Sequence, residues 1–234
     1  MPENRHVSPA VIARLPVYWR VLAEPSDEPE RYVASEMLSQ LTGITEPTIR
    51  RDLWTLGIPG TRGRGYRVDA LLAAVGARLG VNTDTSVAIF GLGNLGQALA
   101  SYPRFAGHNT RVVLLFDADP SKVGDRHGDL PVHPVSAADQ LLPGAGVDIG
   151  IVATPAHAAQ DVAEVLVRNG VGAVLNFAPT ILEVPDGVAV RNVDLSVELQ
   201  VLSYYQRQIE ARTQPSGAQH GSAVAQANSV SLPK

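Results

Sequence analysis

The sequence predicts an α/β protein in which several short helices precede a doubly wound parallel sheet and one final long helix. Apolar segments of strand length alternate with helical segments from residue 86 to residue 191, a pattern typical of parallel sheets. Short amphipathic segments with helix caps come before them, and one amphipathic segment, residues 193–212, comes after. A chain of 234 residues, 45% of them hydrophobic, is long enough for more than one buried core.

One helix is predicted at the start of the chain. Ser8 and Pro9 are the residue types favoured as the N-cap and the first residue of a helix. Apolar residues then recur at helical spacing as far as Leu22. The polar, proline-containing residues 24–30 predict a loop after this helix.

Two further short helices are predicted on either side of a glycine. Ser35 is a suitable N-cap for the second helix, which we expect to end at Gly43. Thr45 is a suitable N-cap for the third helix, which we expect to run to about Leu56. Two short helices joined by a glycine-containing turn indicate a helix-turn-helix, with the third helix as its recognition helix.

The start of this third helix carries side chains suited to DNA. Thr45, Thr48, Arg50 and Arg51 lie in its first two turns, whereas Ile49 is expected to face the core. In a helix-turn-helix, residues at the start of the second helix reach base edges while others hold phosphates. The alternative interpretation is a solvated basic helix face.

A glycine- and arginine-rich segment, residues 57–68, follows the third helix. It predicts a flexible basic hairpin, or wing, in which Thr61, Arg62 and Arg64 contact an adjacent groove of the DNA. The alternative is an ordinary surface hairpin. A fourth helix, with Asp69 as its cap, then leads toward the sheet.

The charge distribution supports a DNA-binding surface more than the net charge does. The formal net charge is −4, but residues 47–78 contain six arginines against two aspartates. Apart from Lys122 and Lys234, every basic residue is arginine, the side chain suited to bidentate phosphate or guanine contacts. A basic patch on an acidic protein is compatible with DNA binding.

The first strand–helix–strand unit, residues 86–119, contains a glycine-rich loop with the sequence Gly91-Leu92-Gly93-Asn94-Leu95-Gly96. Gly91 permits a tight turn, Gly93 lets the backbone approach a pyrophosphate at the helix N-terminus, and Gly96 lets the helix pack close to the strand. Asp117 follows 21 positions after Gly96 and is expected to bind the adenosine ribose and repel a 2′-phosphate. The unit therefore predicts binding of NAD⁺/NADH, the alternative being a glycine-rich turn without a nucleotide.

Three more strands are predicted after an irregular segment, residues 120–134, and a short helix. Their expected ranges are 147–153, 173–177 and 188–191, with a helix over 156–169. Thr154 and Pro155 follow one strand end, and Asn176 and Phe177 lie at the next. Since ligands bind at the carboxyl ends of parallel strands, we expect these four residues to face the nicotinamide half of the cofactor.

The composition excludes several classes of protein. The chain contains no cysteine, which rules out disulfides, thiolate catalysis and cysteine-based zinc sites, and its six histidines are too scattered to indicate a metal. No apolar run is long enough to span a membrane, and the first ten residues lack the apolar core of a signal peptide. We expect a cytoplasmic protein with no metal and no membrane partner.

Four regions are predicted in all. Residues 1–82 are expected to form the winged-helix domain, 83–192 the Rossmann-type domain with its doubly wound parallel sheet, and 193–212 a terminal helix capped by Asp194 or Ser196. Residues 213–234 are rich in Ser, Gln, Ala and Gly without periodicity, which predicts a disordered tail.

This order of domains resembles the Rex family of redox-sensing transcriptional repressors. The resemblance covers roughly residues 7–210. The segments that carry it are Ile49-Arg50-Arg51-Asp52-Leu53, Gly60-Thr61-Arg62-Gly63-x-Gly65-Tyr66, the loop 91–96, Tyr102-Pro103, Phe116-Asp117-x-Asp119-Pro120-x-Lys122-Val123-Gly124 and Leu175-Asn176-Phe177-Ala178-Pro179.

The resemblance implies a homodimer with exchanged C-terminal helices. Such a dimer binds double-stranded operator DNA when free or bound to NAD⁺, and NADH releases it. The resemblance also places Tyr102 and Asp194 among the redox-responsive contacts, with Arg20 as the salt-bridge partner of Asp194 across the dimer. It places Leu195 where an apolar side chain enters the neighbouring nicotinamide pocket.

Two other functions stay open from the sequence. An NAD-dependent dehydrogenase would need a substrate domain and a proton-transfer residue, for which His157 is the candidate after a strand end. We expect no enzyme, because the nucleotide domain leaves no room for a second catalytic lobe. The other alternative is a winged-helix regulator that senses another nucleotide, such as a coenzyme A derivative.

Overall fold

The computed structural model describes residues 7–23, 31–106 and 109–213, and the chain divides into two compact units, one ending at Asn192 and the other starting at Val193. The predicted loop of residues 24–30 lies outside the described residues, as does the predicted tail from residue 214 onward. No helix within the described ranges is long and apolar enough to cross a membrane.

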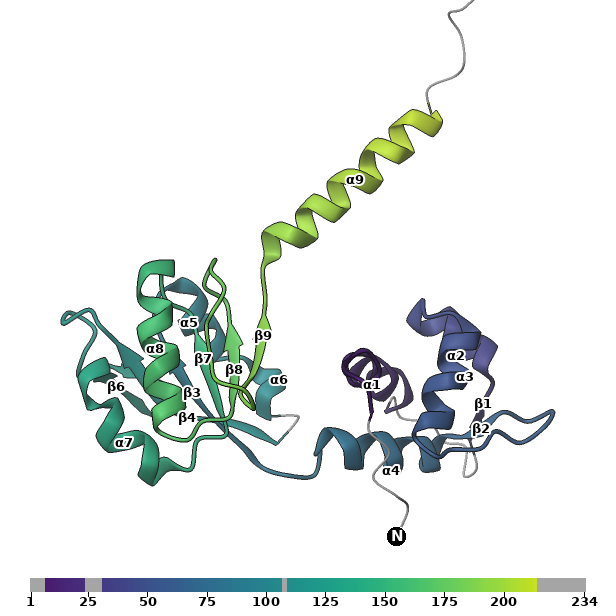
Figure 1. Ribbon diagram of the computed structural model, residues 1–234, viewed down its shortest axis with the longest axis horizontal. Coiled ribbons are helices and arrows are strands. Elements are labelled where there is room, and N and C mark those ends of the chain that lie inside the picture. The colour runs from purple at the N-terminus through teal and green to yellow at the C-terminus, as the bar shows by residue number, and fades with distance from the viewer. Residues whose placement is uncertain (1–6, 24–30, 107–108, 214–234) are drawn as a thin grey trace, which may run out of the picture. The chain divides into compact units, whose positions relative to one another are not determined.

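The first part of the larger unit consists of four helices and a small two-stranded sheet (Figure 1). The helices are α1 Pro9–Leu22, α2 Ser35–Thr42, α3 Glu46–Thr55 and α4 Val68–Leu79. The antiparallel strands are β1 Tyr32–Val33 and β2 Tyr66–Arg67. The two short helices α2 and α3 are joined through Gly43, whose left-handed backbone (φ +71°) ends α2 and confirms the predicted turn.

These helices enclose a core of their own. Leu15 and Tyr18 of α1, Ile49 of α3 and Leu71 and Val75 of α4 are all buried in one cluster. Their spacing of three or four residues along each helix places them on one face, so burial of that face packs the helices together. The predicted inward orientation of Ile49 is therefore confirmed.

The sheet has seven strands in the order β5-β6-β4-β3-β7-β8-β9. The strands are β3 Thr85–Phe90, β4 Thr110–Asp117, β5 Arg126–His127, β6 Leu130–Pro134, β7 Ile149–Val152, β8 Ala173–Asn176 and β9 Ala189–Asn192. All neighbouring pairs are parallel except β5 with β6. From β6 to β9 this is the strand order of a dinucleotide-binding fold, and the order in which successive strands are added reverses between the parallel strands β3 and β7.

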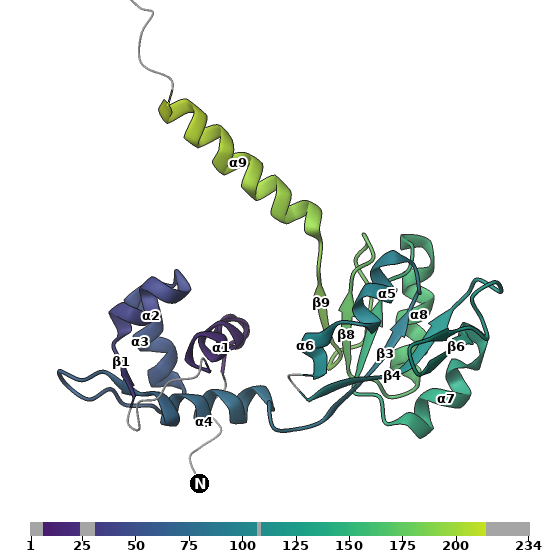
Figure 2. The ribbon, with the colours of Figure 1, turned by 180° about the vertical axis from the view of Figure 1, so that it is seen from behind.

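Helices cover both faces of the sheet (Figure 2). These helices are α5 Asn94–Ala100, α6 Pro103–Ala106, α7 Ala138–Ala145, preceded by a 3₁₀ turn Val135–Ala137, and α8 Ala156–Arg168. Phe90 and Phe116 pack with α7 and α8 on one face, whereas Ile89 and Leu115 pack with residues of α5 and α6 on the other. The alternation along β3 and β4 explains both cores, since successive strand side chains point to opposite faces.

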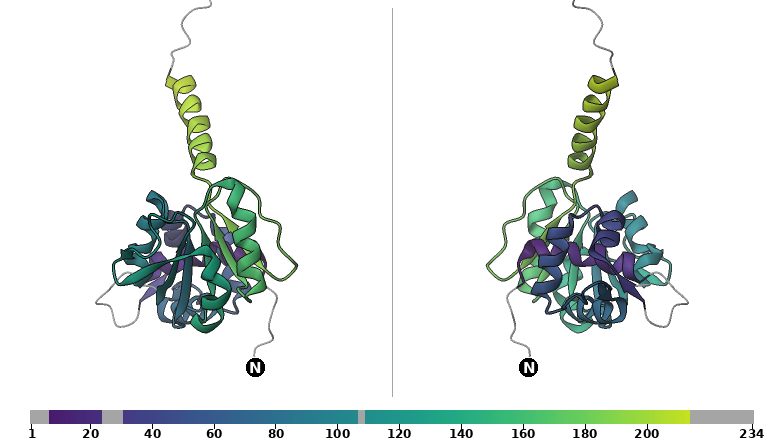
Figure 3. Two further views of the ribbon diagram at one scale, coloured as in Figure 1. Left: turned by 90° about the vertical axis from the view of Figure 1, so that its left-hand side faces the viewer. Right: turned by 90° about the vertical axis from the view of Figure 1, so that its right-hand side faces the viewer.

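The second unit contains α9 Leu195–Thr213, one continuous helix (Figure 3). Its apolar side chains are exposed in the single chain, among them Leu195 at 66%, Leu199 at 64% and Leu202 at 62%. The predicted helix is confirmed. It extends one residue beyond its expected end and thus includes Thr213, which was predicted to belong to the tail.

Several predicted boundaries are wrong. Ser35 is the first residue of α2 rather than its cap, and its hydroxyl bonds a side chain of α3 instead. Asp69 lies inside α4, which begins at Val68 because the strand β2 ends one residue earlier than expected. The predicted irregular segment 120–134 contains the strands β5 and β6. The edge strand β5 has only two residues, too few for a recognisable period, and β6 includes two prolines, Pro131 and Pro134, which favour a turn in a sequence pattern.

Candidate dinucleotide site and DNA-binding surface

The glycine-rich loop between β3 and α5 is shaped by close backbone approaches. Gly91 has a left-handed backbone (φ +93°), and a Cβ atom there would lie 2.6 Å from the Ala153 carbonyl oxygen. A Cβ atom on Gly96 would lie 1.8 Å from the Gly91 carbonyl oxygen. By contrast, a Cβ atom on Gly93 would have no atom within 4 Å. The loop thus packs tightly at its first and third glycines and faces open space at the second, which fits a bound pyrophosphate.

Asp117, at the end of β4, holds this loop. Its carboxylate accepts hydrogen bonds from the backbone N–H groups of Leu92 (2.6 Å) and Asp119 (2.8 Å), and Lys122 Nζ lies 3.3 Å from Oδ2. Burial raises the pKa of Asp117, but these hydrogen bonds and the lysine charge outweigh it, so its pKa lies below the ordinary value. The carboxylate is therefore ionised at neutral pH, and its remaining lone pairs can accept from hydroxyl groups.

The end of β7 brings a second polar group to the loop. The Ala153 N–H donates to the Phe90 carbonyl oxygen (2.8 Å), which places Thr154 beside Gly91. The Thr154 hydroxyl is buried and has no hydrogen-bond partner within the described residues. Because a buried polar group without a partner is unfavourable, this orphan hydroxyl beside an open loop fits a nucleotide that supplies the missing partner.

Asn176 and Phe177, at the end of β8, differ in their surroundings. The Asn176 side chain is buried, and its amide donates to the Thr180 carbonyl (2.8 Å) and to Asn192 Oδ1 (2.9 Å). Its oxygen accepts from the Ala178 N–H (3.0 Å). The side chain thus orders the turn after β8. Phe177 is half-buried against the core and follows β8 directly. Both residues lie at the carboxyl edge of the sheet, as predicted.

The start of α3 carries the predicted DNA-contacting side chains. Thr45, the N-cap, is exposed, and its hydroxyl lies 2.9 Å from that of Thr48. Arg50 and Arg51 are exposed, and Arg50 is paired with Glu46 within the same helix. The predicted outward orientation of both arginines is confirmed.

The hairpin after α3 closes through a bridge between Thr61 and Gly65. The Arg64 guanidinium lies over the Tyr32 ring, 4.0 Å from its centroid, which fixes one arginine of the hairpin. Arg62 lies at the exposed tip of the turn. Thr61, Arg62 and Arg64 are thus presented together, on the hairpin that the glycine-rich segment predicts.

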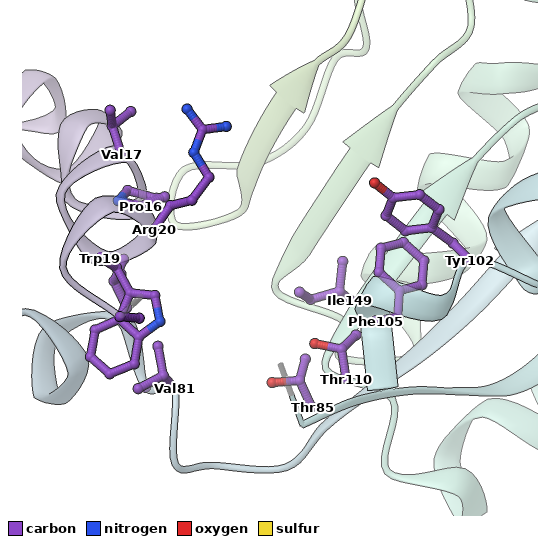
Figure 4. Close-up of a pocket in the computed structure, with 13 residues that line it drawn as sticks. Pro16, Val17, Trp19, Arg20, Val81, Thr85, Tyr102, Phe105, Thr110 and Ile149 are labelled. Carbon is purple, nitrogen blue, oxygen red and sulfur yellow. The ribbon is translucent and has the colours of Figure 1, made fainter. Parts of the chain in front are cut away.

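The redox-responsive residues predicted from the resemblance fall in two places. Arg20, from α1, and Tyr102, from the turn before α6, line one pocket of about 760 Å³ (Figure 4). Tyr102 packs edge-on against Phe105 in this pocket, with ring centroids 5.2 Å apart. Asp194 lies in the other unit, directly before α9, where it accepts hydrogen bonds from the Ser196 N–H (2.8 Å) and hydroxyl (2.6 Å). Asp194 is thus the cap of α9, and Leu195 is its first residue.

Sequence patterns missed several side chains near these sites. Asp52 is buried and bonds Arg14 and Tyr18, although its place in the Arg50-Arg51-Asp52 run suggests a surface residue. Lys122 pairs with Asp117 from five residues away. His157, the candidate base of the dehydrogenase alternative, is exposed at the start of α8. Burial of Asp52 depends on contacts between helices far apart in the chain, which no local pattern reports.

Comparison with known proteins identifies both halves of the larger unit. Residues 82–180 match the family model "CoA binding domain", and residues 6–53 match "Putative DNA-binding protein N-terminus". The redox-sensing transcriptional repressor Rex of Streptomyces avermitilis is 45% identical over 88% of this chain and 81% of its own length. The Rex protein of Anoxybacillus flavithermus is 37% identical over 87% of this chain and 95% of its own length.

Solved structures give the same result. The crystal structure of RSP, a Rex-family repressor, matches with a TM-score of 0.79 and 37% identity over 88% of this chain and 96% of that chain. RSP in complex with β-NAD⁺ and operator DNA matches with a TM-score of 0.80 and 36% identity over 92% of this chain and 99% of that chain. The identity and coverage of these relatives show that the chain belongs to the Rex family.

Proposed function

We propose that this protein is a redox-sensing transcriptional repressor that binds palindromic operator DNA as a homodimer and is released from it by NADH. The observation that carries the proposal is the presence, in one chain, of a helix-turn-helix with exposed arginines and of a dinucleotide-type loop with an open central glycine. The Rex relatives are named as redox-sensing transcriptional repressors, which supports it.

The proposed cofactor is NAD⁺/NADH. RSP, which is 36% identical to this chain, has been solved in complex with β-NADH and in complex with β-NAD⁺ and operator DNA. The backbone around Gly93 faces open space and would receive the pyrophosphate. The buried carboxylate of Asp117, which holds the Leu92 N–H, would accept hydrogen bonds from the ribose. Thr154, Pro155, Asn176 and Phe177 lie at neighbouring strand ends, where the nicotinamide half would bind.

The proposed dimer uses α9. Its leucines are exposed to solvent in the single chain, which is unfavourable. A second subunit that covers them would stabilise the dimer by about 25 cal/mol for each Å² of apolar surface that it buries. Two subunits related by a two-fold axis present two recognition helices, so a palindromic operator follows from the symmetry.

The proposed switch distinguishes the two redox forms by charge. The oxidised nicotinamide ring is cationic and the reduced ring is neutral. A closed apolar pocket formed by Phe177 and by Leu195 of the second subunit would penalise desolvation of the cation. To shift the dimer from 99% open to 99% closed, NADH must bind the closed state more favourably than the open state by about 5.5 kcal/mol in total. Two cofactor sites could share this difference, at about 2.7 kcal/mol each. Arg20, Tyr102 and Asp194 are the proposed responsive contacts.

A second candidate nucleotide is favoured by one observation. The family model that matches residues 82–180 is described as a CoA binding domain. A coenzyme A derivative would place its own pyrophosphate on the same loop, so the glycine geometry alone does not separate the two ligands. The two proposals differ in whether coenzyme A or NADH controls DNA binding.

The test is a titration of the full-length protein on fluorescent palindromic duplexes at fixed salt, because affinity for DNA depends steeply on salt. We expect NADH alone to lower the fluorescence anisotropy, with NAD⁺ and coenzyme A having little effect. Release by coenzyme A would support the second candidate. Failure to bind any duplex, together with hydride transfer from NADH to a small carbonyl compound, would support a dehydrogenase instead.

A further inference from the structure

Three side chains form a closed hydrogen-bonded group where α2 and α3 begin. The Ser35 hydroxyl donates to Glu46 Oε2 (3.0 Å), and Arg50 Nε donates to the Ser35 oxygen (3.1 Å). The Arg50 Nη2 group pairs with the same Glu46 oxygen. Glu46 is therefore held from two sides, by a residue of its own helix and by one of the preceding helix.

This group lies at the end of α3 that a helix-turn-helix presents to DNA. Glu46 is the first residue of α3 and Arg50 lies one turn further along, so both occupy the same face of the helix. The Glu46 side chain is 34% exposed and the Arg50 side chain 60% exposed. The carboxylate is thus accessible yet restrained.

The chemistry of the two groups is complementary to a base pair. A carboxylate only accepts hydrogen bonds, so in the major groove it favours the amino group of cytosine N4 or adenine N6 and is repelled by the oxygen and nitrogen acceptors of guanine and thymine. Arg50 has five N–H donors, of which Ser35 and Glu46 engage two. The outer edge of its guanidinium keeps donors for a guanine.

Arg50 also lowers the electrostatic repulsion between the Glu46 carboxylate and the DNA phosphates. A lone negative charge beside a phosphate backbone is repelled, whereas an ion pair at the same place has no net charge. The fixed geometry lowers the entropy that Glu46 loses when it contacts a base.

We propose that Glu46 is a specificity-determining residue, whose carboxylate, oriented by Ser35 and Arg50, accepts a hydrogen bond from an exocyclic amino group of cytosine or adenine in the operator. This inference rests on the proposed function as a DNA-binding repressor. It assigns to Glu46 the choice of base at one position in each half-site, and to Ser35 the role of a positioning residue.

The test is a selection from a randomised duplex library with the full-length wild type and with Glu46→Ala, followed by titrations of duplexes that differ at the selected position. The wild type should favour the amino-bearing base by about 5- to 150-fold, and Glu46→Ala by less than about twofold. Whether cytosine or adenine is selected identifies the amino group. Glu36→Ala removes the same charge from an exposed site on α2 and should keep the wild-type preference.

Two results would overturn the assignment, and they are distinguishable. If Glu46→Ala binds every duplex more tightly by one common factor and keeps the wild-type preference, Glu46 only competes with DNA for Arg50. If the wild type itself selects no sequence, the repressor function fails and the assignment fails with it. Glu46→Gln keeps the shape of the side chain but carries an amide that both donates and accepts, so it should show a reduced preference if the wild type selects cytosine. If the wild type selects adenine, the amide can pair with both N6 and N7, and Glu46→Gln should keep that preference while Glu46→Ala loses it. Either result excludes misfolding as the cause of the loss in Glu46→Ala.

Discussion

Arg14 on α1 donates two hydrogen bonds to the carboxylate of Asp52 on α3, from Nε to Oδ2 (2.6 Å) and from Nη2 to Oδ1 (2.8 Å). The carboxylate is 1% exposed, and the buried Tyr18 hydroxyl donates to it as well (2.8 Å). Asp52 directly follows the two exposed arginines of α3. The pair therefore sets the orientation of the helix that carries the proposed DNA contacts.

Replacement of Asp52 should destabilise the helical core. Asp52→Ala leaves the Arg14 charge and the Tyr18 hydroxyl without their acceptor. We expect a loss of about 3 kcal/mol in the free energy of unfolding, the low end for a broken buried ion pair because Arg14 is 28% exposed. Urea denaturation followed by circular dichroism measures it. Asp139→Ala, which removes the exposed partner of Arg168, is the control and should leave the stability nearly unchanged. Equal stability of the two variants would contradict the structural role of Asp52.

Tyr18 should make the protein less stable at alkaline pH. Burial raises the pKa of Tyr18 well above its ordinary value. The hydrogen bond from Tyr18 to Asp52 and the negative charge of Asp52 raise this pKa further. The folded state then keeps a proton that the unfolded state loses above about pH 10, so stability is fully present below pH 10 and falls as the pH rises. The free energy of unfolding should fall by up to about 1.4 kcal/mol per pH unit between pH 10 and 12. Tyr18→Phe should show a shallower fall, and an identical slope would contradict the prediction.

Gly93→Ala should abolish the response to NADH without unfolding the protein. A methyl group there meets no protein atom within 4 Å and the backbone is not left-handed (φ −72°), so folding tolerates it. The methyl group would, however, occupy space next to the proposed pyrophosphate site. Calorimetric titration with NADH measures the loss. Gly172→Ala, also at an exposed glycine with no neighbour within 4 Å, should bind NADH normally. Normal binding by Gly93→Ala would show that the loop does not hold the phosphates.

Gly96→Ala should behave differently from Gly93→Ala. Its methyl group would lie 1.8 Å from the Gly91 carbonyl oxygen, a backbone atom that can move only if the loop rearranges. We expect this variant to lose NADH binding and also to melt at a lower temperature, as measured by differential scanning calorimetry. A melting temperature equal to that of the wild type would show that α5 can shift away from the loop at little cost.

Arg50→Ala should weaken binding to operator DNA and leave NADH binding intact. The side chain is 60% exposed at the start of α3, and loss of one good base contact costs a factor of about 5 to 150 in affinity. Anisotropy titrations with the selected operator measure it. Arg168→Ala removes an exposed arginine from α8 and is the matched control. An unchanged operator affinity in Arg50→Ala would contradict the recognition-helix assignment.

Leu199→Glu should convert the proposed dimer into a monomer. Leu199 is 64% exposed on α9, and a buried charge at an apolar interface is strongly unfavourable. Light scattering after size-exclusion chromatography should give half the wild-type mass, with a parallel loss of affinity for palindromic DNA. Gln200→Glu, the next residue along the same helix and also exposed, should remain dimeric. A monomeric wild type would overturn the role of α9.

The local elements were predictable because their signals are local. Ser8 and Pro9 start α1, Gly43 ends α2, and the loop 91–96 lies between a strand and a helix as its glycine spacing predicts. Periodicity likewise predicted that Ile49 is buried. Each of these features depends on the preferences of a few neighbouring residues. Strands as short as β1 and β5 escaped prediction, because two residues carry no recognisable period.

The sequence by itself thus determined the α/β class, the helix-turn-helix and the position of the glycine-rich loop, all of which follow from short-range backbone and side-chain preferences. Only the tertiary structure decided which polar side chains are paired. Asp52 is buried by a helix 34 to 38 positions away in the chain, and Asp117 bonds a backbone N–H group 25 positions away. Ser35 meets Glu46 and Arg50 because α2 packs against α3. Such contacts depend on how helices and strands pack in three dimensions, and the burial that results sets the charge and orientation of each group.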